Sequence, residues 1–228
     1  MSSAITNHLE GKTIVITGAS SGLGKSIAKE FARTSPGNSK LVLTARRIDN
    51  LRDVATQIQQ EAGNGDKLPP VQLDVDQPAE IEKFFPSLPD ELKDADILVN
   101  NAGLVRGKAQ TPDIESENMA VIFDTNVTGL INMTQAILPI YKTRPDGGRG
   151  DIINIGSIAG PAVSLFTDAL CKELIATRIY VVEIDLGQVE TVVVFAAGLR
   201  ENVVIADTMV YSQPSGNLLS RVVAINLN

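Results

Sequence analysis

The chain of 228 residues carries a formal net charge of -7, from 20 Lys and Arg against 27 Asp and Glu. This acidic balance argues against a nucleic-acid-binding protein, while 43% hydrophobic and 21% charged residues are typical of a folded domain with a buried core. Its apolar runs are only a few residues long, whereas a membrane-spanning helix needs about 20, so no membrane partner is expected.

Short runs rich in β-branched residues alternate along the chain with segments whose apolar residues recur at helical spacing. The expected strands are residues 13–17, 40–44, 71–73, 97–99, 151–155, 179–184 and 203–206. The expected helices include residues 22–34, 49–62, 78–85, 117–142 and 161–177. The alternation predicts an α/β fold, a single Rossmann-type domain over residues 1–228 with a doubly wound parallel sheet of about seven strands. Residues 1–10 and 214–228 are expected to be flexible, and the short crossovers after residue 157 indicate truncation in the second half.

A glycine-rich turn, TGASSGLG at residues 17–24, joins the first strand to the first helix. Glycine permits positive φ and lets the backbone approach a ligand, and the following helix N-terminus suits a pyrophosphate. Gly24-Lys25-Ser26 also resembles the end of a phosphate-binding P-loop, but that pattern requires glycine where the chain has Ala19. The favoured prediction is a dinucleotide site, with a P-loop and a turn without ligand as the alternatives.

The second expected strand is followed by Arg46 and Arg47. At this position dinucleotide folds that bind NAD carry an acidic residue, whereas those that bind NADP carry a basic residue that holds the 2′-phosphate. The pair therefore predicts NADP as the cofactor, and the alternative is an ordinary solvated basic pair.

Several motifs at consistent spacing resemble those of the short-chain dehydrogenase/reductase family. They are the glycine-rich turn, Asp74 after the third strand, the NNAG sequence at residues 100–103, Asn126 in NVTG, and Ser157 after the fifth strand. Within the family, the chain most resembles fungal NADP-dependent 3-hydroxy acid dehydrogenases of the serine or allo-threonine type. The resemblance implies hydride transfer at the CH–OH group of a small hydroxy acid or related alcohol.

The resemblance also assigns roles to individual residues. Ser157 and Asn126 match the family's catalytic serine and asparagine. The cofactor-binding residues that it implies are Gly18, Ser20, Ser21, Gly22, Leu23, Gly24, Arg46, Arg47, Asp74, Val75, Asn101, Ala102, Gly103, Val189 and Thr191.

The chain departs from the family at its central catalytic motif, Tyr-x-x-x-Lys. The residues four positions after Tyr141, Tyr180 and Tyr211 are proline, isoleucine and serine. Residues 158–160 and 165–170 still resemble the segments on either side of this motif, so the motif looks deleted at residues 161–164. The substrate-covering loop that the family has after Thr191 also looks missing. We therefore expect impaired activity, and the alternatives are an inactive NADP(H)-binding protein, a poorly folded truncated product, or an altered splice or gene model.

The remaining residues predict no metal site and a reducing compartment. His8 is the only histidine and Cys171 the only cysteine, so neither a metal-binding cluster nor an internal disulfide is expected. Residues 1–10 lack the basic and apolar character of a targeting signal, which favours a cytoplasmic location. Because relatives assemble through the helices at residues 117–142 and 161–177, the resemblance implies a homo-oligomer.

Overall fold

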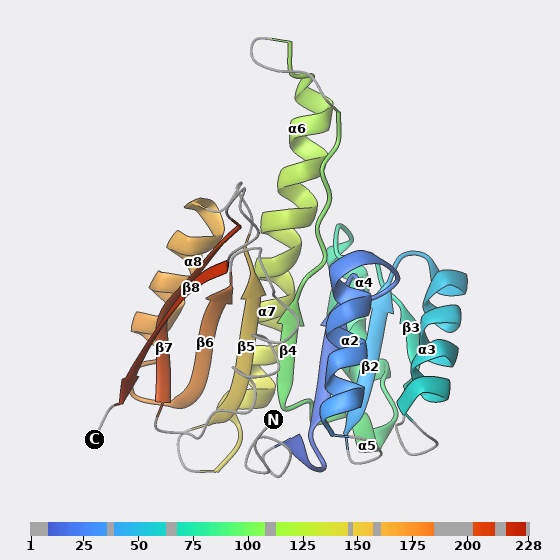
Figure 1. Cartoon of the computed structure of the whole chain (residues 1–228), viewed down its shortest axis with the longest axis horizontal. Helices are drawn as coiled ribbons and strands as arrows, with labels where there is room; N and C mark the ends of the chain where they lie inside the picture. Colours follow the sequence, from blue (N-terminus) through green and yellow to red (C-terminus); the bar gives the residue numbers. More distant parts are fainter. Residues whose placement is uncertain are drawn as a thin grey trace.

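The computed structural model describes residues 9–35, 39–62, 68–107, 113–145, 148–156, 161–184, 203–212 and 218–226, which form a central sheet with helices on both faces (Figure 1). The strands of the central sheet are β1 (Thr13–Thr17), β2 (Lys40–Ala45), β3 (Pro70–Gln72), β4 (Ile97–Asn100), β5 (Arg149–Ile155) and β6 (Arg178–Ile184). The helices are α2 (Gly22–Thr34), α3 (Ile48–Ala62), α4 (Pro78–Ser87), α5 (Asp90–Lys93), α6 (Ser116–Phe123), the π-helix η1 (Asp124–Thr128), α7 (Gly129–Lys142) and α8 (Pro161–Glu173). None of the described helices is long and apolar enough to cross a membrane.

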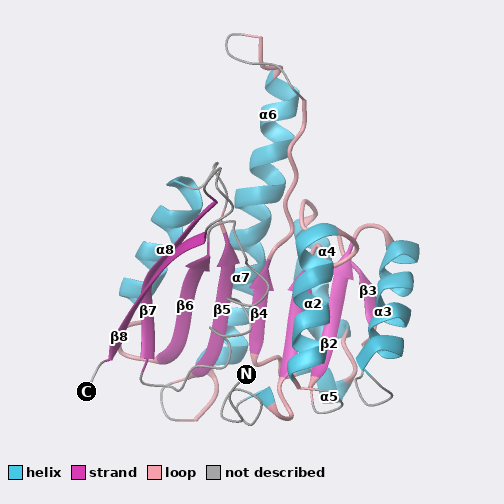
Figure 2. Cartoon of the chain, in the orientation of Figure 1, coloured by secondary structure: helices cyan, strands magenta, loops and turns pink. Residues whose placement is uncertain are grey.

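All neighbouring strands of the central sheet are parallel, in the order β3-β2-β1-β4-β5-β6. Strands β2 and β3 follow β1 on one side of the sheet. The chain then crosses to the other side of β1, where β4, β5 and β6 follow in order. Helices lie in front of and behind the strands (Figure 2). Ligands of such sheets bind outside the carboxyl ends of the strands where the order reverses, which is between β1 and β4 here. The predicted Rossmann-type α/β fold is confirmed.

The central strands are buried on both faces because successive side chains enter two separate apolar clusters. Ile14 and Ile16 of β1 pack on one face with side chains of α2 and α3, including the fully buried Phe31. Val15 packs on the opposite face with side chains of α4, α7 and α8, including Tyr141. The two clusters hold the carboxyl ends of β1 and β4 in fixed positions relative to each other.

The end of the chain differs from the expected seventh parallel strand. Strand β7 (Val203–Ser212) pairs antiparallel with β8 (Leu218–Asn226), so the parallel sheet contains six described strands. A parallel partner requires a crossover of about a dozen residues, whereas the short connection from β7 to β8 suits an antiparallel hairpin. Strand β8 also lies within the tail that we expected to be flexible, and its content of valine and isoleucine favours a strand.

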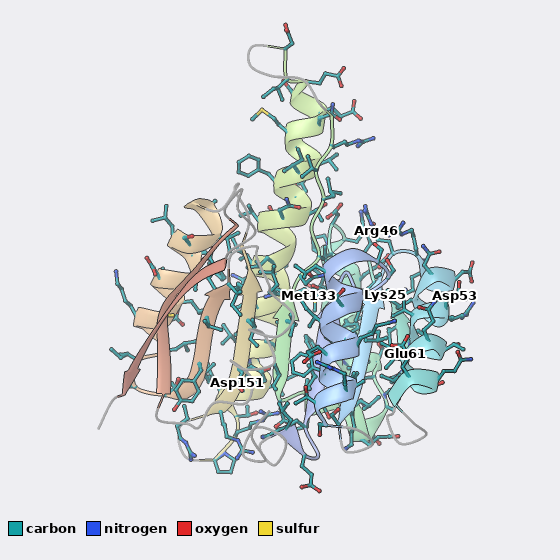
Figure 3. The ribbon with its side chains drawn as sticks, in the orientation of Figure 1. Lys25, Arg46, Asp53, Glu61, Met133 and Asp151 are labelled. Carbon is teal, nitrogen blue, oxygen red and sulfur yellow. The ribbon has the colours of Figure 1, made fainter. Side chains whose placement is uncertain are left out.

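Several charged residues, among them Asp151 (Figure 3), lie near the amino ends of the strands, opposite the switch point. Lys12 Nζ lies 3.2 Å from Asp96 Oδ1, and Arg144 Nη1 lies 3.8 Å from the same oxygen. The Tyr141 hydroxyl donates to the backbone carbonyl of Asp151 at 3.2 Å. Burial of the carboxyl group raises the pKa of Asp151 to about 7 against the attraction of Lys12, and repulsion by Asp96 adds to this rise.

The Asp151→Asn variant is expected to be more stable than the wild type at about pH 8 but not at about pH 4, by roughly 1–3 kcal/mol. Between the unfolded aspartate pKa of about 3.9 and the folded value of about 7, the folded protein retains a proton that unfolding releases. Wild-type stability therefore falls as pH rises through this window, and asparagine removes that loss. Urea unfolding of both proteins across the window measures it, and a difference that does not change with pH would contradict the prediction.

Candidate cofactor and active site

A pocket of about 360 Å³ opens at the carboxyl ends of β1, β4 and β5. Nine of the predicted site residues line it, namely Gly18, Ser21, Gly22, Leu23, Gly24, Asn101, Ala102, Gly103 and Asn126. Sequence reasoning missed its other lining residues, Leu104, Val105, Val127, Ile155, Gly156 and Val163. Five of the six are ordinary apolar residues, which come from β5, η1, α8 and the loop after β4, and only their position at this edge of the sheet could have indicated them.

The glycine-rich turn needs glycine at two positions for steric reasons. Gly18 has φ +68°, and a Cβ added there would lie 2.8 Å from the Ala102 Cα. A Cβ on Gly24 would lie 2.5 Å from the Gly18 carbonyl oxygen. The turn therefore packs directly on the backbone that follows β4. Helix α2 begins beside it with Ser21 as an N-cap that makes no side-chain capping bond, so its first amides can bind an anion.

Hydrogen bonds of Thr17 and Asn101 join the carboxyl ends of β1 and β4. The buried Thr17 hydroxyl accepts hydrogen bonds from the backbone amides of Asn101, at 3.0 Å, and Ala102, at 2.9 Å. It also donates to the Val99 carbonyl at 3.3 Å. The Asn101 side-chain amide in turn donates to the Thr17 carbonyl at 2.9 Å. These bonds fix the two loops that form opposite walls of the pocket.

A second polar network lies behind the pocket and joins four elements. Asn100 of β4 donates to the Thr134 hydroxyl of α7 and to the Asn154 side-chain oxygen of β5, each at 3.0 Å. Asn154 donates in turn to the Thr167 hydroxyl of α8 at 2.9 Å. All four side chains are buried, so the network ties the two helices to the strands that carry the pocket.

Neither of the two predicted arginines lines the pocket, and Arg47 contacts the glycine-rich turn. Arg47 Nη2 donates to the Ser21 hydroxyl at 2.8 Å and to the Ser20 hydroxyl at 3.3 Å. Arg46, at the carboxyl edge of the sheet (Figure 3), has its Nη1 3.9 Å from Asp76 Oδ2. Both side chains are exposed, and together they place positive charge next to the start of α2.

Asp74 and Val75 lie in the turn after β3 and do not line the pocket. Asp74 Oδ1 accepts the Asp76 backbone amide at 3.2 Å, which makes the turn compact. A Cβ on Gly129 would lie 2.9 Å from the Val75 carbonyl oxygen, so the turn packs closely against the start of α7. These two predicted cofactor-binding residues therefore lie beside the start of α7, which directly follows the π-helix η1.

Asn126 lies on the π-helix η1, within the segment expected to be one regular helix. Its side-chain oxygen accepts the Leu104 amide at 2.8 Å, and its side-chain amide donates to the Leu104 carbonyl at 3.0 Å. A π-helical turn is often found at functional sites. Here it directs Asn126 against the loop that follows the NNAG sequence.

Three predicted site residues, Ser157, Val189 and Thr191, lie outside the described residues. Gly156, which directly precedes Ser157, lines the pocket and donates its amide to the Ile184 carbonyl at 2.9 Å.

Neither tyrosine whose side chain is described lies at the pocket. Tyr141 is fully buried on α7, and burial raises its pKa well above the usual value. Tyr180 pairs with Asp151 at the amino end of β5, whereas Ile155 at the pocket pairs with Ile184. Four residues of strand separate Tyr180 from the pocket, a distance of about 13 Å. Tyr180 therefore does not replace the missing tyrosine.

Comparison with known proteins gives one consistent family. A family model described as short chain dehydrogenase matches residues 12–201. The chain is 37% identical to an NADP-dependent 3-hydroxy acid dehydrogenase of Schizosaccharomyces pombe, over 92% of this chain and 96% of that protein. That alignment runs over 255 positions while 92% of this chain is about 210 residues, so about 45 positions have no counterpart here.

Two further relatives cover less of the chain. The NADP-dependent 3-hydroxy acid dehydrogenase YdfG of Escherichia coli strain K12 is 39% identical over 64% of this chain, a match that spans 54% of its own length. The crystal structure of serine dehydrogenase from Escherichia coli superposes with a TM-score of 0.72 at 31% identity, covering 82% of this chain and 92% of that one.

Proposed function

Because the chain belongs to the short-chain dehydrogenase family, we propose that it binds NADP(H) and transfers hydride at the CH–OH carbon of a small hydroxy acid or related alcohol. The observation that carries this proposal is the position of Arg47, whose guanidinium contacts Ser20 and Ser21 of the glycine-rich turn. The printed functions of the relatives, NADP-dependent 3-hydroxy acid dehydrogenase and serine dehydrogenase, support the same cofactor and substrate class.

The residues of the turn fit a dinucleotide. A Cβ at Gly18 or Gly24 would meet the side-chain nitrogen of Asn101 as well as backbone atoms, so the turn has no room for a larger residue at either position. The first amides of α2 would hold the pyrophosphate, and Arg46 and Arg47 would hold the 2′-phosphate. When bound, the nicotinamide supplies the acceptor or donor of the hydride. Asn101 would support the turn through the Thr17 carbonyl rather than contact the cofactor phosphate.

The Arg47→Ala variant is expected to bind NADPH about 10- to 100-fold more weakly, because a charge-assisted hydrogen bond to phosphate contributes about 1.5–3 kcal/mol. NADH lacks the 2′-phosphate, so its affinity should change little. The matched control is Arg52→Ala, which removes an exposed arginine of α3 that pairs with Asp49. Titrations followed by nicotinamide fluorescence measure all three proteins, and an equal loss for NADPH and NADH would overturn the assignment of Arg47.

We further propose that turnover is slow. Oxidation of an alcohol needs a group that takes the hydroxyl proton while the hydride leaves. The sequence contains no Tyr-x-x-x-Lys, and both tyrosines with described side chains lie away from the pocket. Asn126 and Ser157 can still orient and polarise the substrate oxygen.

Assembly and location are proposed on separate grounds. Helix α6 extends beyond the carboxyl edge of the sheet and buries none of its side chains (Figure 1). Met119 and Phe123 on it and Leu165 on α8 are exposed apolar residues. These surfaces support a homo-oligomer, which sedimentation equilibrium tests, and a strictly monomeric protein would contradict it. The single cysteine supports a cytoplasmic location, which fluorescence microscopy of the tagged chain tests; secretion would contradict it.

A further inference from the structure

Asp76 connects two parts of the molecule that belong to different steps of the proposed function. Its Oδ2 accepts a hydrogen bond from the Thr125 hydroxyl at 3.0 Å and lies 3.9 Å from Arg46 Nη1. Its Oδ1 is buried and has no hydrogen-bond partner among the described residues. One carboxylate oxygen is therefore shared between a side chain at the end of β2 and one on the π-helix η1.

The two partners of Asp76, Arg46 and Thr125, differ in how freely their side chains can move. The Arg46 side chain is 52% exposed, so it can turn toward a ligand in solution. Thr125 is buried and directly precedes Asn126, whose side chain holds both backbone groups of Leu104 at the pocket. A change in the charge around Asp76 therefore alters its hydrogen bond with the buried Thr125 on η1.

The turn that carries Asp76 is tightly packed, which restrains the position of the carboxylate. A Cβ on Gly129 would lie only 2.9 Å from the Val75 carbonyl oxygen, and Asp74 Oδ1 holds the Asp76 amide at 3.2 Å. The carboxylate is thus fixed from its own backbone and from the start of α7. It has little freedom to follow Arg46 when that side chain moves.

We propose that Asp76 is a positioning residue that couples binding of a 2′-phosphate at Arg46 to the π-helical turn that presents Asn126. This inference rests on the proposed function, because it takes the 2′-phosphate of NADP(H) as the ligand of Arg46. A dianionic phosphate competes well for an arginine that is 3.9 Å from its carboxylate. Once Arg46 turns away, the carboxylate is no longer neutralised and accepts a stronger hydrogen bond from Thr125.

The test uses hydrogen exchange of the full chain and two small probes. Adenosine 2′,5′-bisphosphate carries the 2′-phosphate without a nicotinamide, and adenosine 5′-monophosphate lacks it. At saturation, the first probe is expected to slow exchange in residues 100–107 and 120–130 about two- to tenfold, in the range of ordinary coupling between sites. The second probe is expected to leave exchange in these segments unchanged.

Two variants remove the coupling in different ways. Asp76→Asn keeps an acceptor for Thr125 but removes the charge, and Thr125→Val keeps the charge but removes the hydrogen bond. Both are expected to bind the 2′,5′-bisphosphate within about threefold of the wild type and to lose the slowing of exchange. The matched control is Thr143→Val, at the far end of the same helical segment, which should retain the full response.

The outcomes separate this inference from the proposed function. Binding of the bisphosphate without any change in exchange, or an unchanged response in both variants, overturns the role of Asp76 alone. Failure of the wild type to bind the bisphosphate at all overturns the proposed cofactor, and the inference falls with it. Loss of the response in both variants with binding retained supports the coupling.

Discussion

Replacing Gly18 with alanine is expected to lower the free energy of unfolding by about 2–5 kcal/mol and to abolish NADPH binding. Two costs combine at this position. The φ of +68° is one that alanine adopts only with strain, and the new Cβ would lie 2.8 Å from the Ala102 Cα. Because the opposing atom belongs to the backbone, relief requires that the turn separate from the loop after β4. That separation would open the walls of the pocket.

The Gly11→Ala variant is the matched control for this prediction. Gly11 has φ +74°, but a Cβ there has nothing within 4 Å. It therefore incurs only the backbone cost of about 1–2 kcal/mol, and NADPH binding should persist. Chemical unfolding and fluorescence titration of the two variants measure the difference. Equal losses of stability in both would show that the close approach of Gly18 to Ala102 has no energetic consequence.

The second large expected effect is a low rate of turnover. With serine as substrate, we expect this chain to reduce NADP⁺ at least about 100-fold more slowly than the Schizosaccharomyces pombe relative measured alongside it. The reason is the missing proton acceptor, since positioned acid–base groups contribute about a hundred- to ten-thousand-fold. Initial rates followed by nicotinamide absorbance, with both cofactor and substrate saturating, give the comparison.

A small exogenous base distinguishes a missing proton acceptor from a damaged site. Added imidazole should raise the rate of this chain in proportion to its concentration, because it can take the hydroxyl proton in place of the missing tyrosine. A rate comparable to that of the relative, or no response to imidazole at any measurable rate, would contradict the proposed cause.

Much of the first half of the fold could be predicted from local pattern alone. Strand β1 and helix α2 have the bounds expected from the sequence, because continuous β-branched runs and helical spacing are strong signals when a sheet is buried on both faces. The TGASSGLG turn was likewise predictable, since Gly18 requires its positive φ for reasons visible in one short segment.

The features that sequence reasoning missed all depend on contacts between distant segments. The π-helix η1 interrupts a segment whose sequence pattern predicts one regular helix. It ends where Val75 packs against Gly129, and no local sequence pattern predicts that contact. The phosphate-binding role of Arg46 and Arg47 stays a prediction. Their separate partners, Asp76 and the serines of the turn, depend on how β2 and β3 end. The pairing of β7 with β8 is the exception, because these two strands are neighbours in the sequence.

Titration of the purified wild-type chain with NADPH, and with NADH as the control, tests the central claim most directly. Selective binding of NADPH, seen as enhanced reduced-nicotinamide fluorescence, is predicted from the glycine-rich turn and the adjacent arginines. It would show a folded cofactor site in a chain that lacks the Tyr-x-x-x-Lys motif. Absence of binding to either nucleotide would contradict that claim and would mean that the shortened second half does not support a working Rossmann domain.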